Sequence, residues 1–255
     1  MKARPALPAT EAPGAGTGGV RRRRAALTRE AIIEAALNIG STEGGSALTF
    51  SRLGKELGAD PTAVYRHFRD KDELVLALTD RMVEESVRRI QDTDPETADW
   101  RQWLRLVAIS VRSVYLERPA IAVLAATRTA ATPAETTSVE RIIAVLHKAG
   151  LPVIAAAEVY RGLLDMTLSM TQCTAAWNLL PAEVQEQDAR AWAVTYAMLP
   201  EEEFPHLRQS VPRLAELNRD DSAVFESVLD IFLDGVQSRI ERSGAAGPEA
   251  TEPAR

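Results

Sequence analysis

The residues from Gly58 to Pro61 place the end of one short helix and the start of another within a single tight turn. Glycine is favoured just past a helix C-terminus, aspartate as an N-cap, and proline at the first helical position, where its missing N–H costs nothing. Upstream, apolar residues recur every three or four positions between Phe50 and Leu57, behind Thr49 as N-cap. The pattern predicts two short helices, the second over 61–68, joined by about three residues.

The second of these helices has two unlike faces. At helical spacing, Val64 and Phe68 share the side that packs, while Thr62, Tyr65 and Arg66 share the opposite side. Such a pair meets the requirements of a helix-turn-helix that reads the DNA major groove, because small residues allow close approach and arginine reaches a guanine edge or a phosphate. A plain helical hairpin is the alternative that this geometry leaves open. The expected DNA contacts are Thr49, Ser51, Arg52, Pro61, Thr62, Ala63, Tyr65, Arg66, His67 and Lys71.

The charge of the chain is divided unevenly along its length. The net charge is −6, yet residues 1–71 hold 12 basic and 7 acidic side chains, while the remainder holds 18 and 29. Because phosphate attraction acts where the cations are, a basic end on an acidic protein favours a polyanion contact confined to that end. An ordinary solvated surface would explain the charge alone equally well.

Beyond the motif, the apolar spacing and the prolines predict helix after helix and no strands. The class is all-α, with an N-terminal three-helix helix-turn-helix domain and a larger helical C-terminal domain. We expect a disordered basic arm over 1–24, the DNA-binding domain over 25–72, the larger domain over 73–243 and a disordered tail over 244–255. The predicted helices are 28–43, 49–57, 61–68, 70–90, 99–117, 119–127, 133–149, 153–180, 183–199 and 220–241.

Several classes of protein are disfavoured by what the chain contains. No uninterrupted apolar run reaches the length of a membrane span, and the first residues lack a secretory apolar core, so we expect a cytoplasmic protein without a membrane partner. Cys173 is the single cysteine, which excludes an intrachain disulfide, and we expect its thiol to be buried. No catalytic residues, metal ligands or cofactor can be proposed, which argues against an enzyme. A helical protein–protein interaction module without DNA binding remains the alternative.

The segment from Leu48 to Leu78 resembles the DNA-binding domain of the tetracycline-repressor (TetR) family of bacterial transcription regulators. The characteristic residues are Tyr65, His67 and Phe68, followed by Lys71 at the start of the next helix. The resemblance implies an all-helical, Ω-shaped homodimer that binds double-stranded operator DNA. It also implies a divergent C-terminal domain that binds a small-molecule effector and thereby controls DNA affinity, most often as a repressor released from a palindromic operator.

The C-terminal part is similar in layout to the branch nearest the tetracycline repressor, through "EEEFPHLRQSVPRLAEL" and the helix that follows. The magnesium-linked tetracycline site of that branch is not carried over, since only His147 and His206 are available outside the motif. Without the family, the helices 153–180 and 220–241 read as ordinary core. With it, they are expected to form a four-helix bundle with their dimer mates.

An effector cavity requires apolar walls and a few polar groups that fix orientation. Each candidate on the C-terminal helices could equally be core, and the acidic balance of this region weakly favours neutral or cationic ligands. Trp192 is a further candidate as an aromatic lid. The expected ligand-binding residues are Trp103, Val107, Leu124, His147, Leu164, Asp165, Leu168, Thr171 and Trp177.

Overall fold

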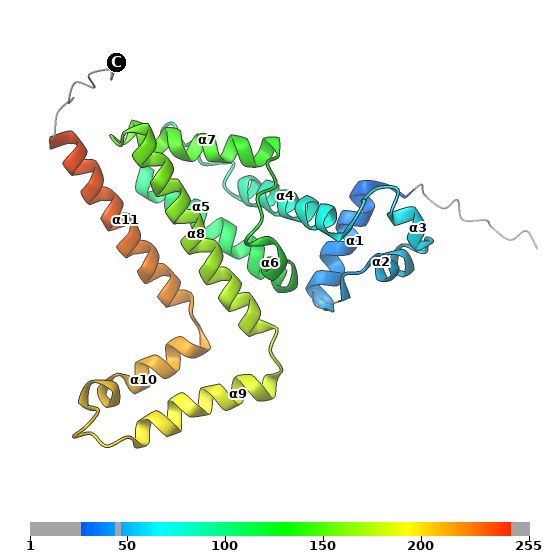
Figure 1. The fold of residues 1–255 in the computed structure, drawn as a ribbon. Helices are drawn as coiled ribbons and strands as arrows, with labels where there is room; N and C mark the ends of the chain where they lie inside the picture. The colour runs from blue at the N-terminus through cyan, green and yellow to red at the C-terminus, as the bar shows by residue number, and fades with distance from the viewer. Residues whose placement is uncertain (1–26, 44–46, 246–255) are drawn as a thin grey trace, which may run out of the picture.

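The computed structural model describes residues 27–43 and 47–245, which fold into helices without a strand in these ranges. Figure 1 shows a small N-terminal head beside a larger helical body. The head consists of α1 (Arg29–Thr42), α2 (Phe50–Leu57) and α3 (Pro61–Val64), and α4 (Lys71–Arg89) leads from it into the body. The body contains α5 (Trp100–Leu116), α6 (Pro119–Ala125), α7 (Pro133–Lys148), α8 (Val153–Asn178), α9 (Ala182–Arg190), α10 (Pro205–Arg219) and α11 (Ser222–Ala245).

The apolar core of the head continues into the body through α4 and α6. Val64 and Phe68 are fully buried against α1 and α2, as their spacing predicted. Leu78 on α4 and Ile121 on α6 belong to the same cluster. A second cluster, centred on Leu104 of α5, joins α5, α7, α8 and α11. The orientation of the head is therefore tied to the packing of the body helices.

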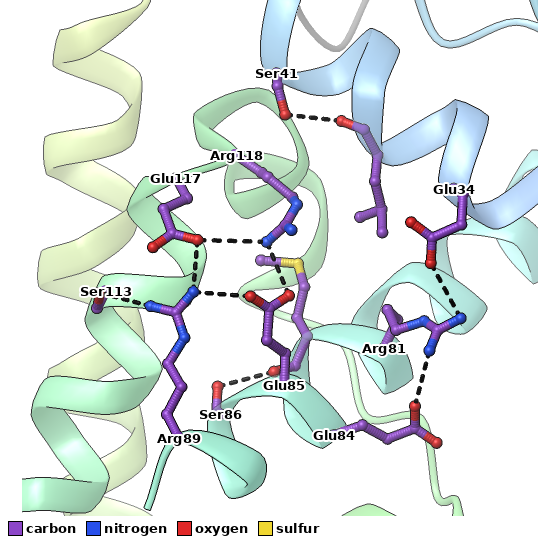
Figure 2. A network of polar contacts seen from close by, with 12 residues as sticks. Glu34, Ser41, Arg81, Glu84, Glu85, Ser86, Arg89, Ser113, Glu117 and Arg118 are labelled. Atoms are coloured by element: carbon purple, nitrogen blue, oxygen red, sulfur yellow. Dashed lines mark hydrogen bonds and ion pairs between the residues drawn. The ribbon is translucent and has the colours of Figure 1, made fainter.

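Polar contacts attach α4 to its neighbours at the middle of the helix and at its C-terminal end (Figure 2). Near the head, Arg81 of α4 lies 3.1 Å from the carboxylate of Glu34 on α1. Near the body, Arg89 lies 2.6 Å from Glu117, which is the C-cap residue of α5. The same α4 thus makes ion pairs with both parts of the molecule.

Helices α9 and α10 project away from the body and connect α8 to α11 (Figure 1). The predicted helix over 183–199 is α9 followed by a π-helical turn, Ala191–Thr195, and a 3₁₀ turn, Tyr196–Met198. Helix α10 was not predicted, and it contains Pro205 in its first turn and Pro212 in its interior. In the first turn, the missing N–H of Pro205 is tolerated.

Three further expectations need revision, and two predicted segments fall outside the described residues. The helix predicted over 61–68 ends at Val64, with Tyr65 as its C-cap, and the chain continues as a turn. Cys173 is exposed on α8, in contrast to the expected burial. Helix α11 extends to Ala245, so the predicted tail begins too early. The expected arm over 1–24 and the remaining tail lie outside the described residues.

Candidate DNA-binding surface and ligand cavity

Side-chain caps fix the start of each helix in the head. The Thr49 hydroxyl accepts a 3.1 Å hydrogen bond from the Arg52 N–H, and an Asp60 carboxylate oxygen accepts one of 2.8 Å from the Thr62 N–H. Asp60 also accepts from the Thr62 hydroxyl, and this bond lowers the pKa of the carboxyl group. Gly58 ends α2 with a φ of 59°, a conformation that glycine adopts without penalty. These are the caps that the sequence predicted.

The turn between α2 and α3 lies directly against Gly54. A Cβ atom at this position would lie 2.9 Å from the Ala59 carbonyl oxygen and 3.1 Å from the Pro61 nitrogen. The absence of a side chain at Gly54 therefore permits the close approach of this turn.

Aromatic contacts hold the outer face of α3 in place. Tyr65 packs edge-on against Phe50 while remaining 59% exposed. On the opposite side, the guanidinium of Arg29 lies over the ring of the buried Phe68, 4.5 Å from its centroid. One face of the segment is thus anchored and the other is offered to solvent.

The ten predicted DNA contacts lie on this small head or directly after it. Arg66 is exposed and, among the residues that the structure covers, forms no ion pair. Six of the ten are exposed, namely Thr49, Ser51, Thr62, Tyr65, Arg66 and Lys71, and four are half-buried, namely Arg52, Pro61, Ala63 and His67.

Arg52 differs from the other predicted contacts because its charge is already paired. Its Nε lies 2.9 Å from one Glu43 carboxylate oxygen, and its Nη1 lies 2.8 Å from Glu56. The hydrogen bond with Arg52 lowers the pKa of Glu43. A phosphate would have to compete with two carboxylates for this guanidinium.

A cavity of about 730 Å³ lies in the body between α4, α5, α7, α8 and the segment after α6. This volume falls within the range of small-molecule sites. Five predicted ligand residues line it, namely Trp103, Val107, Leu164, Asp165 and Leu168. The apolar walls come from α4, α5, α7 and α8.

The other four predicted ligand residues do not line this cavity. Leu124 packs against the core that the head shares with α6, and the fully buried Thr171 donates its hydroxyl to the Thr167 carbonyl at 2.6 Å. The His147 ring nitrogen lies 2.8 Å from the Leu151 carbonyl oxygen, at the end of α7. Trp177 lies near the end of α8, and Trp192 packs against Tyr196 with ring centroids 4.7 Å apart.

The cavity contains polar residues that sequence reasoning missed, including Arg128, Glu135, Tyr115 and Tyr160. Burial raises the pKa of Tyr115 and of Tyr160, and the negative charge of Glu135 adds to both shifts. The buried indole N–H of Trp103 has no hydrogen-bond partner within the described ranges. Helical spacing could have suggested the tyrosines, but no sequence signal marks the loop that carries Arg128.

Two negative observations apply to the described residues. No group of three or more His, Cys, Asp or Glu side chains is arranged to hold a metal ion there. None of the helices in these ranges combines the length and the apolar character that crossing a bilayer requires.

Comparison with known proteins assigns both parts of the chain. Residues 32–78 match the family model "Bacterial regulatory proteins, tetR family", and residues 93–240 match "Tetracyclin repressor-like, C-terminal domain". An HTH-type transcriptional repressor of Mycobacterium tuberculosis is 29% identical over 242 residues, covering 90% of this chain and 87% of the relative. The class A tetracycline repressor from transposon 1721 of Escherichia coli is 31% identical, covering 84% of this chain and 92% of its own.

Solved structures give the same assignment. Apo ActR from Streptomyces coelicolor superimposes with a TM-score of 0.73 at 26% identity, covering 88% of this chain and 99% of ActR. The complex of ActR with actinorhodin gives a TM-score of 0.72 over 85% of this chain and 99% of ActR. The chain therefore belongs to the TetR family of bacterial regulatory proteins and is a ligand-responsive, DNA-binding regulator of transcription.

Proposed function

We propose that this protein is a repressor that binds a palindromic operator as a homodimer and is released by a small molecule held in the body cavity. One observation carries the proposal. The exposed α3 and the ligand-sized cavity of the body both adjoin the same helix, α4. The related M. tuberculosis and E. coli proteins are named as repressors, which supports this direction of control. The proposal assigns no catalytic reaction to the chain and places it in the cytoplasm, where its DNA target lies.

The first turn of α3 is suited to enter the major groove. Pro61 and Ala63 are small and half-buried, so they permit close approach to the base edges. Arg66 is exposed and long enough to reach a guanine or a phosphate. Tyr65, His67 and Lys71 would contact phosphates, which fixes register rather than sequence.

The outward face of α11 supports a homodimer. Its exposed stripe, at helical spacing, consists of Ser227, Ile231, Gly235 and Ser238. Ile231 is 68% exposed within the single chain, and small neighbours allow a second helix to approach. On α8, Ile154 is 75% exposed. Pairing of these helices with those of a second copy would bury both isoleucines in an isologous interface.

Control by a ligand follows from the position of α4. Its first residue, Lys71, belongs to the proposed DNA surface, while Val83 and Val87, farther along the same helix, line the cavity. In one arrangement of the dimer, the two heads no longer match successive major grooves. A ligand that binds better to this arrangement lowers operator affinity by the coupling free energy. ActR, a relative with the same fold, has been solved with actinorhodin bound, which supports small-molecule occupation of the cavity here.

Selection of bound fragments from the source genome tests this function. We expect wild-type protein to enrich a small set of sequences that share an inverted repeat, while Arg66→Ala enriches none of them. Arg213→Ala, which removes an exposed arginine of α10, is the matched control and should enrich the wild-type set. Failure of the wild-type protein to enrich any sequence would contradict the proposal and favour a protein–protein interaction module.

A further inference from the structure

The loop between α6 and α7 contacts the cavity on one side and α4 on the other. Four consecutive residues, Ala126 to Thr129, line the cavity. In the same loop, Arg128 donates to both carboxylate oxygens of Asp72, with an Nη2–Oδ2 distance of 2.8 Å. One side chain is therefore both part of the cavity wall and a partner of α4.

Asp72 lies in the first turn of α4, one residue after Lys71 of the proposed DNA surface. A second contact links the same two elements, because the Thr132 hydroxyl donates to the carboxylate of Asp80, two turns farther along α4. The loop thus holds α4 at two points. Loss of the Arg128 contact alone would free the end of α4 nearest the head while the Thr132 contact keeps the loop docked.

Two buried polar groups in the cavity wall, an indole N–H and a phenol O–H, can each donate a hydrogen bond to a ligand. The buried Trp103 N–H has no partner, and the hydroxyl of the 3% exposed Tyr115 forms no hydrogen bond within residues 27–43 and 47–245. The carboxylates that line the cavity already accept from other groups. Glu135 accepts from the Ala131 N–H at 2.5 Å, Asp165 from Arg161 at 2.7 Å, Glu96 from Lys148 at 3.3 Å and Asp94 from the Glu96 N–H at 2.9 Å.

We propose that the effector is an aromatic anion whose charged group takes the Arg128 guanidinium away from Asp72. The inference rests on the proposed function and adds the chemical class of the effector and the residue through which it acts. Trp103, Tyr115 and Tyr160 supply the aromatic walls for such a molecule. The unpaired donors and Arg128 supply partners for a carboxylate, sulfonate or phenolate.

The anionic group of the ligand and the Asp72 carboxylate compete for Arg128, and we expect the ligand to bind it more strongly. The Asp72 side chain is 56% exposed, so water screens its pair with Arg128 and keeps that pair weak. A ligand that covers Arg128 from the cavity side would exclude water from the new contact, and charge-assisted hydrogen bonds strengthen as the local dielectric falls. The Asp72 carboxylate, once released, is solvated at no large cost. The lining of the cavity holds four carboxylates, Asp94, Glu96, Glu135 and Asp165, and three guanidinium groups, Arg128, Arg141 and Arg161. The proposal therefore rests on the position of Arg128 and not on the overall charge of the lining.

Two fluorescent probes that differ by one anionic group test the proposal directly. Anilinonaphthalene sulfonate is an aromatic anion, and N-phenylnaphthylamine is its uncharged analogue. With full-length protein, Arg128→Gln should weaken sulfonate binding by about tenfold, because a charge-assisted contact is lost. Asp72→Asn should tighten sulfonate binding, because it removes the competitor for Arg128. Neither variant should change the affinity for the uncharged probe.

Opposite effects of the two partners of one ion pair are not expected from a purely structural role. Arg213→Gln, which removes an exposed ion pair on α10, is the matched control and should bind both probes as wild type does. Unchanged sulfonate affinity in Arg128→Gln, weaker affinity in Asp72→Asn, or no saturable sulfonate binding to wild type would each overturn the proposal.

The DNA readout separates this inference from the proposed function. On a fragment selected by wild-type protein, the sulfonate probe should weaken DNA binding by wild type, whereas the uncharged probe should not. The sulfonate effect should be lost in Arg128→Gln. Specific DNA binding that the sulfonate probe leaves unchanged would overturn the role of Arg128 alone, whereas absence of specific DNA binding would overturn the repressor function itself.

Discussion

The ring of Tyr65 stands edge-on to the ring of Phe50, with centroids 4.6 Å apart and an interplanar angle of 71°. This contact joins the residue after α3 to the first residue of α2, and it fixes the tyrosine ring while leaving most of the side chain exposed. The ring packing of Tyr65 can therefore be tested separately from the DNA contact that we propose for its hydroxyl group.

Tyr65→Phe should weaken operator binding without changing the stability of the head. The ring contact is retained, while the loss of one phosphate hydrogen bond costs about 1 kcal/mol of binding free energy. Tyr65→Ala should in addition lower the free energy of unfolding by about 1 kcal/mol, because the aromatic pair is lost. Fluorescence anisotropy and urea unfolding measure the two effects. Wild-type DNA affinity in Tyr65→Phe would remove the hydroxyl from the proposed DNA surface.

Gly54→Ala should destabilise the head. The new Cβ would lie 2.9 Å from the Ala59 carbonyl oxygen, so the turn must shift, at a cost of about 1–3 kcal/mol in unfolding free energy. Thermal unfolding gives the change, and DNA affinity should fall with it. Gly244→Ala is the control, because a Cβ there meets no atom within 4 Å. Equal melting temperatures for the two variants would contradict the close contact.

Arg112 is expected to stabilise the body through a largely buried network. It is 7% exposed, donates to Asp221 at 2.6 Å, and lies over the ring of Phe225 at 4.6 Å from the centroid. Arg112→Ala should reduce the free energy of unfolding by about 2 kcal/mol, less than for a fully buried pair because Asp221 is partly exposed. Urea unfolding tests this against Arg213→Ala, whose exposed pair should contribute at most about 0.5 kcal/mol.

The N-cap of α4 should make the stability of this region depend on acidity. The hydrogen bond from the Glu73 N–H lowers the pKa of Asp70 below its usual value of 3.8, and the hydrogen bond from Arg69 makes a smaller contribution in the same direction. Because the folded-state pKa is the lower one, this stabilisation is complete above the unfolded pKa and is lost as the pH falls through the folded pKa.

Asp70→Asn should therefore reduce the acid-induced loss of stability while retaining a cap, since asparagine caps helices well. Urea unfolding at neutral pH and at a pH below 3.8 measures the difference. The control is Asp188→Asn on α9, whose carboxylate makes no hydrogen bond to any described residue. The same acid response in Asp70→Asn and wild type would contradict the role of this cap.

Ile231→Glu should convert the proposed homodimer into a monomer. The charged side chain would be placed on the exposed stripe of α11 that we propose as the interface, where an unpaired buried charge is strongly unfavourable. Sedimentation velocity measures the mass, and operator affinity should fall because one head then binds alone. Leu106→Glu is the control. It changes an exposed apolar residue of similar size on a different helix, α5, and the variant should remain dimeric. A dimeric Ile231→Glu protein would place the interface elsewhere.

Local chemistry explains why the head could be predicted from sequence. Thr49, Gly58 and Asp60 act through their immediate neighbours, so their spacing alone indicates the caps and the turn. The early end of α3 at Val64 was not predictable, because its four residues depend on the packing of Val64 and Phe68 rather than on helix propensity.

The cavity could be predicted only in part, because it depends on contacts between distant segments. Leu164 and Leu168, four positions apart on α8, both line the cavity, whereas the third candidate on this helix, Thr171, is fully buried and does not. Arg128 lies in a loop without periodicity and meets Asp72 across 56 positions of sequence. Only the folded chain brings these residues together.

Fluorescence anisotropy on a genomic fragment selected by the wild-type protein tests the central claim most directly. Arg66→Ala should bind this fragment at least about tenfold more weakly than wild type and lose its preference over unrelated DNA, while Arg213→Ala behaves as wild type. Equal affinity of wild type and Arg66→Ala for the selected fragment would contradict the assignment of α3 and its following turn as the DNA-reading surface.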